Sequence, residues 1–317
     1  MRAVQITEFG GPEVLTVTEI EAPVAHEGQV LITVDRAGLN YADTHQVENS
    51  YLAPSKLPLV PGAEVAGRTA DGRRVVALTG SGGYAEQAVA YAPYVYDLPD
   101  GVTDGQALAL VLQGTTAWHL LRTSTRLAEG ESVLVHAAAG GVGSLAVQLA
   151  KLWGAGRVIA TASSEEKRAQ ALELGADVAI DGDPEGLADR ILAANDGKPV
   201  DIVLEMVGGP AFDESLKALA RFGRLVTFGA ASRTAATPIA AADLMRGSRT
   251  VAGFWLADCF AQPELLSAPL AELLSLTEAG KLRPLVGGEY AMTDVATAHE
   301  DLRSRKSVGK LLLDPSK

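Results

Sequence analysis

The clearest candidate for a chemical function is a glycine-rich segment in the middle of the chain. The apolar run Val133-Leu134-Val135 is followed by His-Ala-Ala-Ala-Gly-Gly-Val-Gly-Ser over residues 136–144. A strand, a turn without large side chains and a helix, in this order, bind the pyrophosphate of a dinucleotide, because backbone N–H groups and the helix dipole face it. We therefore predict cofactor contacts from Ala139, Gly140, Gly141, Val142 and Gly143.

Ala138 stands where this fingerprint usually has its first glycine. A glycine pattern alone is weak evidence, and these glycines could instead serve only to pack a helix on a sheet. The strand before them and the amphipathic helix after them, with Leu145, Leu149 and Leu152 on one stripe, favour the dinucleotide site.

The residues after the next expected strand indicate which dinucleotide binds. Enzymes that use NAD place an Asp or Glu about 20 residues after the glycines, where it binds the ribose 2′-hydroxyl. Here the strand expected at 157–161 is followed by Ser163, Ser164, Lys167 and Arg168, with no acidic residue directly at the strand end. Two hydroxyls and two cations can hold a 2′-phosphate, so we predict NADPH. A serine here can also cap the next helix, and the two roles are compatible.

The elements around this segment alternate in a regular way. Short apolar runs and helical patterns follow one another, which predicts a doubly wound parallel sheet of Rossmann type. The expected strands are 132–136, 157–161, 177–180, 201–205, 223–228 and 250–255, and the expected helices between them are 165–174, 184–194 and 211–220.

The first third of the chain has a different pattern of apolar residues and turns. Short β-branched runs at 30–34, 75–78 and 86–89 are separated by Gly- and Asp-containing turns, which predicts an antiparallel barrel or sandwich. A long apolar segment at 106–121 predicts the helix that ends this region. After about residue 260 we expect a helix at 265–279 and a strand at 309–313.

Composition excludes several classes of function. The 317 residues carry a net charge of −12, which disfavours nucleic acid as the main partner. Cys259 is the only cysteine, so no intrachain disulfide can form. We find no signal-peptide pattern and no stretch of about 20 apolar residues that could span a bilayer, so we expect a cytoplasmic protein without a membrane partner.

Five motifs spread over nearly the whole chain give it a family resemblance. Together they are similar to the zinc-free quinone oxidoreductase (zeta-crystallin-like) branch of the medium-chain dehydrogenase/reductase superfamily. The motifs are Met1–Val4, Gly38–Asp43, Pro61–Gly67, His136–Ser144 and Ser307–Leu311.

The resemblance implies an α/β architecture with two domains. Residues 1–119 and 259–317 would form a GroES-like β-barrel catalytic domain, and residues 120–258 a Rossmann domain that binds NADPH. The active site would lie in the cleft between them. The resemblance also implies a homodimer or a tetramer.

Metal ligands of the zinc-dependent relatives are missing at the matching positions. Asn40 stands where those dehydrogenases carry a cysteine, and Ala63, before Glu64, stands where they carry a histidine. The four-cysteine lobe of their structural zinc is absent as well. Since zinc needs three or four correctly placed N, S or O ligands, we expect no metal.

Site residues carry over from the resemblance as expectations. Asn40 and Tyr51 would line the catalytic site, while His45 replaces a cleft tyrosine of some relatives and could donate a proton or form a polar wall. Tyr51 could instead be a loop anchor, and Phe254 and Trp255 could be core residues. Further expected cofactor contacts are Thr116, Phe228, Gly229, Phe254, Trp255 and Lys310.

The predicted cofactor and the missing zinc ligands together indicate which reaction the protein catalyses. Without zinc, hydride transfer must rely on positioning the cofactor against an acceptor that is already electrophilic, so we predict an NADPH-dependent reductase of quinones or other activated carbonyl compounds. One alternative is an enoyl or enone reductase that acts on conjugated C=C bonds, including those of thioesters. Another is an NADPH-binding sensor without turnover.

Overall fold

The computed structural model describes residues 1–317, and the chain divides into two compact units. Unit 1 contains Met1–Thr115 and Phe260–Lys317, and unit 2 contains Thr116–Cys259. The boundaries expected from the sequence, after residues 119 and 258, lie four residues later and one residue earlier than these.

Unit 2 is built on a sheet of six parallel strands in the order β10–β9–β8–β11–β12–β13. This is the doubly wound Rossmann arrangement predicted from the alternating pattern. The strands are β8 (Ser132–Val135), β9 (Arg157–Ala162), β10 (Val178–Asp181), β11 (Val200–Glu205), β12 (Leu219–Thr227) and β13 (Thr250–Gly253).

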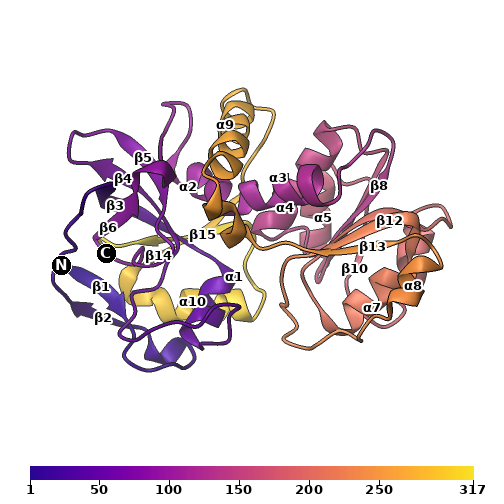
Figure 1. The fold of residues 1–317 in the computed structure, drawn as a ribbon, viewed down its shortest axis with the longest axis horizontal. Helices are drawn as coiled ribbons and strands as arrows, with labels where there is room; N and C mark the ends of the chain where they lie inside the picture. The colour runs from indigo at the N-terminus through magenta and orange to yellow at the C-terminus, as the bar shows by residue number, and fades with distance from the viewer. The chain divides into compact units, whose positions relative to one another are not determined.

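Helices cover both faces of this sheet. In Figure 1, α4 and α5 lie on one side and α7 on the other, and α6 packs against α7. The helices are α4 (Gly141–Leu152), α5 (Glu165–Glu173), α6 (Leu187–Ala194), α7 (Gly209–Lys217) and the short α8 (Ala241–Met245). The sequence pattern extends α7 to residue 220, but the chain already enters β12 at Leu219, opposite an irregular register with β11.

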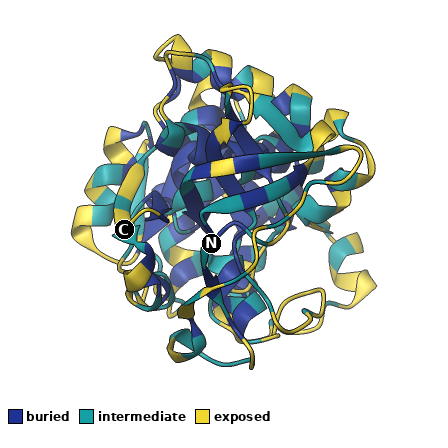
Figure 2. Ribbon diagram, turned by 90° about the vertical axis from the view of Figure 1, so that its left-hand side faces the viewer, coloured by how far each residue is buried: buried dark blue, intermediate teal, exposed yellow.

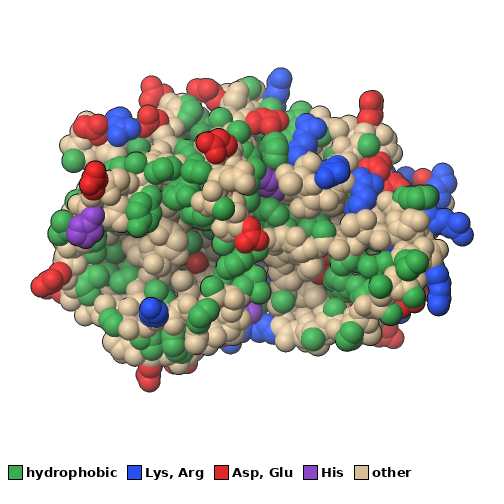
Figure 3. All heavy atoms as spheres, viewed as in Figure 1, with side chains coloured by type: hydrophobic (Ala, Val, Ile, Leu, Met, Phe, Trp, Pro, Cys, Tyr) green, Lys and Arg blue, Asp and Glu red, His purple; other side chains and the backbone are tan.

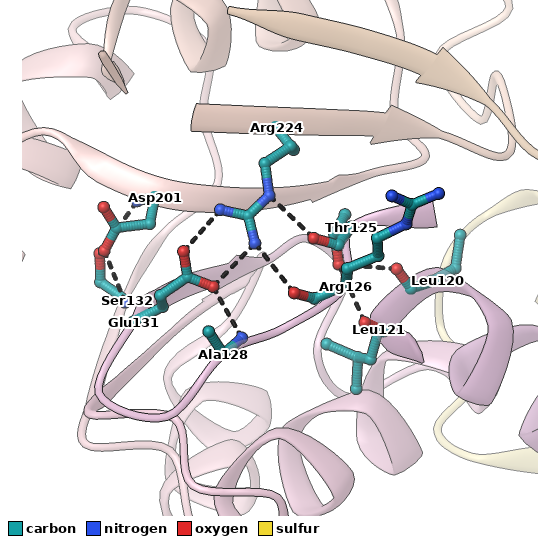
Figure 4. A network of polar contacts seen from close by, with 9 residues as sticks. All are labelled: Leu120, Leu121, Thr125, Arg126, Ala128, Glu131, Ser132, Asp201 and Arg224. Atoms are coloured by element: carbon teal, nitrogen blue, oxygen red, sulfur yellow. Dashed lines mark hydrogen bonds and ion pairs between the residues drawn. The ribbon is translucent and has the colours of Figure 1, made fainter. Parts of the chain in front are cut away.

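An ion pair ties together the amino-terminal ends of the central strands of unit 2 (Figure 4). The Arg224 guanidinium donates to both carboxylate oxygens of Glu131, at 2.6 and 2.7 Å, and to the Thr125 carbonyl at 2.8 Å. Nearby, the Ser132 hydroxyl donates to Asp201 at 2.7 Å. These contacts fix the loop that enters β8 at the sheet end away from the glycine-rich turn.

Unit 1 is built around a predominantly antiparallel sheet. Its path is β14–β15–β3–β4–β5–β7, and β6 pairs with β3; only β14 and β15 are parallel. A separate hairpin joins β1 and β2. The strands are β1 (Arg2–Gln5), β2 (Thr16–Glu19), β3 (Gln29–Leu39), β4 (Glu64–Thr69), β5 (Arg74–Leu78), β6 (Gln87–Tyr91), β7 (Val95–Asp97), β14 (Val286–Ala291) and β15 (Lys310–Asp314).

Both ends of the chain contribute to unit 1, because the carboxy-terminal β15 pairs with β3, with Leu311 opposite Leu39. Figure 2 shows the buried strands of this sheet inside a rim of exposed turns. The helices of the unit are α1 (Tyr41–Val47), α2 (Asp104–Leu108), α9 (Glu264–Glu278) and α10 (Val295–Arg303). The sequence patterns predict α9 but not α1 or α10.

The helical segment expected at 106–121 is interrupted twice. After α2 come a π-helical segment, Ala109–Gly114, then α3 (Thr115–His119), then a second π-helical segment, Leu120–Ser124. The wider turns are accompanied by side-chain contacts to backbone carbonyls, from Thr115 to Leu110 at 3.3 Å and from Thr125 to Leu120 at 2.8 Å. Such segments often occur at functional sites, and Gln113 lies in the first.

Charge is dispersed on the surface drawn in Figure 3, where acidic side chains are scattered and basic ones gather toward the part of unit 2 that carries α8. None of the helices combines the length and the apolar character that crossing a bilayer requires.

Candidate active site

The predicted cofactor residues of unit 2 gather at one edge of its sheet. The glycine-rich turn follows β8, residues 163–168 follow β9, Phe228 and Gly229 follow β12, and Phe254 and Trp255 follow β13. Carboxyl ends of parallel strands meet at one edge, and ligands of doubly wound sheets bind there.

The glycine-rich turn leads directly into α4. The first N–H groups of a helix have no intrahelical acceptor. Here the N-cap residue is Gly140, which has no side chain that could accept the N–H groups of Gly141, Val142 and Gly143. A Cβ at Gly143 would lie only 2.4 Å from the Ala137 carbonyl oxygen, so this position requires glycine. Such a helix end suits a phosphate.

His136 supports this turn from within the unit. Its Nε2 lies 2.7 Å from the Ser215 hydroxyl, and its Nδ1 lies 3.1 Å from the Thr161 hydroxyl. Because Ser215 donates its own proton to the Ala211 carbonyl, Nε2 must carry the imidazole proton. Burial lowers the pKa of His136 to about 4, so the ring is neutral at physiological pH. These contacts support a structural role for His136.

The predicted 2′-phosphate residues surround the start of α5. Ser164 is the N-cap, and its Oγ accepts a hydrogen bond from the Lys167 N–H at 3.3 Å, so the capping role is present. The Arg168 guanidinium donates to the Ala162 carbonyl at 3.2 Å and to Asp181 at 3.4 Å. Burial lowers the pKa of Lys167. Contact with a phosphate stays a prediction for these residues.

Aromatic residues and one buried acid complete the edge. The Phe254 ring stacks on His119 of α3 with centroids 5.5 Å apart, and Thr116 is buried in the same helix. Sequence patterns gave no hint of Glu205, which ends β11, is fully buried and accepts the N–H groups of Val207 and Gly208 at 2.7 and 2.8 Å. Burial raises its pKa.

In unit 1, Asn40 lies in a buried polar cluster at the N-cap of α1. Its side-chain Nδ2 donates to Glu64 at 2.9 Å, and its Oδ1 accepts from Gln113 at 3.1 Å and from the Lys310 ammonium at 3.0 Å. Lys310 also forms an ion pair with Glu64, and both side chains are fully buried.

This cluster gives Lys310 partners that the sequence did not predict. Its ammonium, expected to contact the cofactor, already has the Glu64 carboxylate and the Asn40 amide oxygen as partners inside unit 1. The pairing of Lys310 with Glu64 was not predicted, although a lysine at the start of an apolar strand was a signal for it. Two acceptors in the cluster, Glu64 Oε2 and Gln113 Oε1, are buried without a donor, a situation that tends to occur at functional sites.

A second buried network adjoins Asn40. Asp43 accepts hydrogen bonds from the Asn40 N–H at 2.8 Å and from the Tyr84 hydroxyl at 2.7 Å, and the Tyr84 oxygen lies 3.3 Å from His299 Nε2. Burial raises the pKa of Asp43 to about 6, against the opposing effects of the Tyr84 hydrogen bond and the Lys310 charge. Burial lowers the pKa of His299 to about 4.

The other two predicted catalytic residues lie together. His45, in the last turn of α1, places its ring 6.4 Å from that of Tyr51 at an interplanar angle of 29°, and 5.5 Å from the ring of Tyr41. The His45 Nδ1 is 2.9 Å from the Ser50 hydroxyl. Helix α1 connects Asn40, its N-cap residue, with His45 in its last turn, and Tyr51 lies beside the helix through its ring contact with His45. Their catalytic roles stay predictions.

Two protein families match parts of the chain. The alcohol dehydrogenase GroES-like domain matches residues 26–100, in unit 1, and the zinc-binding dehydrogenase family matches residues 141–275, mostly in unit 2.

Relatives match it from end to end. A quinone oxidoreductase of Pseudomonas aeruginosa is 36% identical, with 99% of both chains covered, and one of Homo sapiens is 33% identical, with 99% of this chain and 97% of the relative covered. The solved structure of Escherichia coli quinone oxidoreductase complexed with NADPH is 32% identical, covers 99% of this chain and 100% of its own, and superposes with a TM-score of 0.93.

Alanine substitutions at Gly143 and Gly140 should have different effects on stability and on dinucleotide binding. Gly143→Ala forces a Cβ to 2.4 Å from the Ala137 carbonyl oxygen, so we expect a loss of about 1–3 kcal/mol of stability as well as weaker dinucleotide binding. At Gly140 the same oxygen is 3.2 Å away, so Gly140→Ala should keep its stability and weaken binding roughly tenfold. Urea unfolding and fluorescence titration with NADPH measure both; equal stability of the two variants would contradict the packing argument.

His136 should make folding sensitive to acid. Its pKa falls from about 6.5 unfolded to about 4 folded, so between these values the unfolded state binds more protons and stability falls as the pH falls, by up to about 3 kcal/mol. His136→Gln should therefore cost more stability at pH 7 than at pH 4.5. Urea unfolding at both pH values measures this, with exposed His26→Gln as the control. A pH-independent difference would show that His136 does not titrate in this way.

Proposed function

Since the chain belongs to the quinone oxidoreductase branch of the medium-chain dehydrogenase/reductase superfamily, we propose that it is an NADPH-dependent oxidoreductase that reduces quinones or other activated carbonyl compounds without zinc. The proposal that no zinc is used rests on one observation. Asn40 and Glu64 hydrogen-bond to each other and to the buried ammonium of Lys310.

Zinc does not fit these residues. An amide is a poor zinc ligand compared with a thiolate or imidazole, and Ala63 offers no donor atom. The Glu64 carboxylate is paired with Lys310, whose positive charge would repel a metal ion. Nowhere in the structure do three His, Cys, Asp or Glu side chains come together as a metal site.

NADPH fits the carboxyl edge of the sheet in unit 2. The α4 N-terminus would hold the pyrophosphate, and Ser163, Ser164, Lys167 and Arg168 would hold the 2′-phosphate. Similarity to the Escherichia coli enzyme solved with NADPH supports this assignment. Bound there, NADPH supplies a hydride.

Unit 1 would supply the groups that bind the acceptor. Asn40 and Tyr51 can donate hydrogen bonds to a carbonyl oxygen, which stabilises the negative charge that this oxygen gains when the hydride arrives. One proton must follow to give the hydroquinone or alcohol, and His45 beside Tyr51 is a group that can pass it. Quinones suit this site because they accept a hydride without a metal.

We also propose that the protein forms a homodimer. Strand β13 ends the parallel sheet, and near it Phe222 and Met245 are 73% and 78% exposed. Edges of parallel sheets are normally covered, and a second copy can cover this one. Light scattering should give twice the chain mass of 32.9 kDa, or four times for a dimer of dimers. The monomer mass at micromolar concentration would refute the dimer.

The cofactor and metal assignments can be tested together. We expect NADPH, much more than NADH, to be oxidised with 1,4-benzoquinone or 9,10-phenanthrenequinone, and a chelator to have no effect. Arg168→Ala should raise KM for NADPH roughly tenfold and leave KM for NADH unchanged. Inhibition by the chelator would refute the zinc-free reaction. Tight NADPH binding without quinone turnover would favour an enone substrate or a sensor.

A further inference from the structure

The polar cluster of Asn40, Glu64, Gln113 and Lys310 is formed by three neighbouring strands of unit 1 and by the π-helical segment Ala109–Gly114, which carries Gln113. Lys310 begins β15, Glu64 begins β4, and Asn40 follows the end of β3, which lies between them. A Cβ at Gly38 of β3 would lie 2.4 Å from Glu64 Oε1 and 2.7 Å from Lys310 Cε. Glycine at this position therefore leaves the space in which the ion pair forms.

Charge fixes the orientation of every amide in the cluster. An ammonium only donates hydrogen bonds and an ionised carboxylate only accepts them. Asn40 must therefore turn Oδ1 toward Lys310 and Nδ2 toward Glu64, because the reverse orientation would oppose donor to donor and acceptor to acceptor. Gln113 must then turn its Nε2 toward the same Oδ1. One Nδ2 proton of Asn40 is left outside these contacts.

The same contacts polarise the Asn40 amide. Two donors, one of them a full positive charge, lie 3.0 and 3.1 Å from its oxygen in a buried site. They draw electron density from nitrogen to oxygen, which makes the remaining N–H a stronger donor, and hydrogen bonds reinforce one another more in a low dielectric.

We propose that Lys310 is a positioning residue for catalysis: paired with Glu64, it orients and polarises the Asn40 amide so that the remaining N–H binds the acceptor oxygen. This inference rests on the proposed function, in which hydride addition leaves negative charge on that oxygen until a proton arrives. Lys310 acts through Asn40 and does not touch the acceptor itself.

Kinetics can separate positioning from general structural support. Lys310→Met alone would strand the Glu64 charge in the interior, so the informative variant is Lys310→Met/Glu64→Gln, which removes both charges and nearly keeps the volume. We expect kcat with 1,4-benzoquinone to fall roughly 10- to 100-fold, with the Kd for NADPH unchanged. In an Asn40→Ala background the same two substitutions should have almost no further effect.

A matched control is the ion pair of Arg224 and Glu131 in unit 2. Arg224→Met/Glu131→Gln also removes a hydrogen-bonded pair, and it should leave kcat unchanged. Equal effects on kcat of the two double variants, or a full additional loss in the Asn40→Ala background, would overturn the proposal.

A spectroscopic measurement tests the network without any substrate. The chain has only three asparagines, Asn40, Asn49 and Asn195, so selective 15N labelling gives three side-chain amide signals. We expect the Asn40 protons to resonate downfield of the others and to move upfield in Lys310→Met/Glu64→Gln, while the other two signals stay in place. An unmoved Asn40 signal would overturn the proposal. If the wild type reduces no quinone, the proposed function fails, and this spectrum still decides whether Lys310 controls the Asn40 amide.

Discussion

The buried ion pair between Lys310 and Glu64 is the constraint on which unit 1 depends. An ammonium without solvent exposure is tolerated only with a close acceptor, and here the acceptors come from β4 and from the residue that follows β3. The pair therefore links the last strand of the chain to strands of its first third. It can form only when β15 is in register beside β3, so it couples closure of the sheet to the geometry around Asn40.

Units 1 and 2 make their sites in different ways. In unit 2, the site is formed mainly by backbone: parallel strands end at one edge, and the first N–H groups of α4 are not capped by a side chain, because the N-cap residue is Gly140. In unit 1, the site is formed by side chains. The charges of Lys310 and Glu64 orient the amides of Asn40 and Gln113. The site in unit 2 therefore requires glycine at position 143, where a side chain would contact the backbone, whereas the buried polar cluster of unit 1 must be satisfied as a whole.

The two units also differ in how they hold their buried titratable groups. His136 supports the glycine-rich turn as a neutral ring held by two hydroxyls, and burial keeps it neutral. Asp43 lies beside Asn40 and is destabilised as an anion by burial, yet it accepts two strong hydrogen bonds. For His136, burial favours the neutral ring that its two hydroxyl partners hold, whereas for Asp43 the two donors favour the anion that burial disfavours.

Local pattern allowed much of unit 2 to be predicted from the sequence. All six strands and the phosphate-binding turn follow from alternation and from glycines at fixed spacing, which are properties of neighbours in the chain. The same reasoning missed α1 and the π-helical segment that carries Gln113, because neither has a strong local pattern. The family resemblance implied a cofactor contact for Lys310, and nothing in it indicated the ion pair that Lys310 forms with Glu64.

The amino-acid sequence by itself thus determined the class of fold, the dinucleotide turn and the absence of zinc ligands at the expected positions. Only the tertiary structure decided what surrounds Asn40. Residues 40, 64, 113 and 310 are far apart in the chain, and which of them donates and which accepts depends on distances that exist only after β3, β4 and β15 have paired.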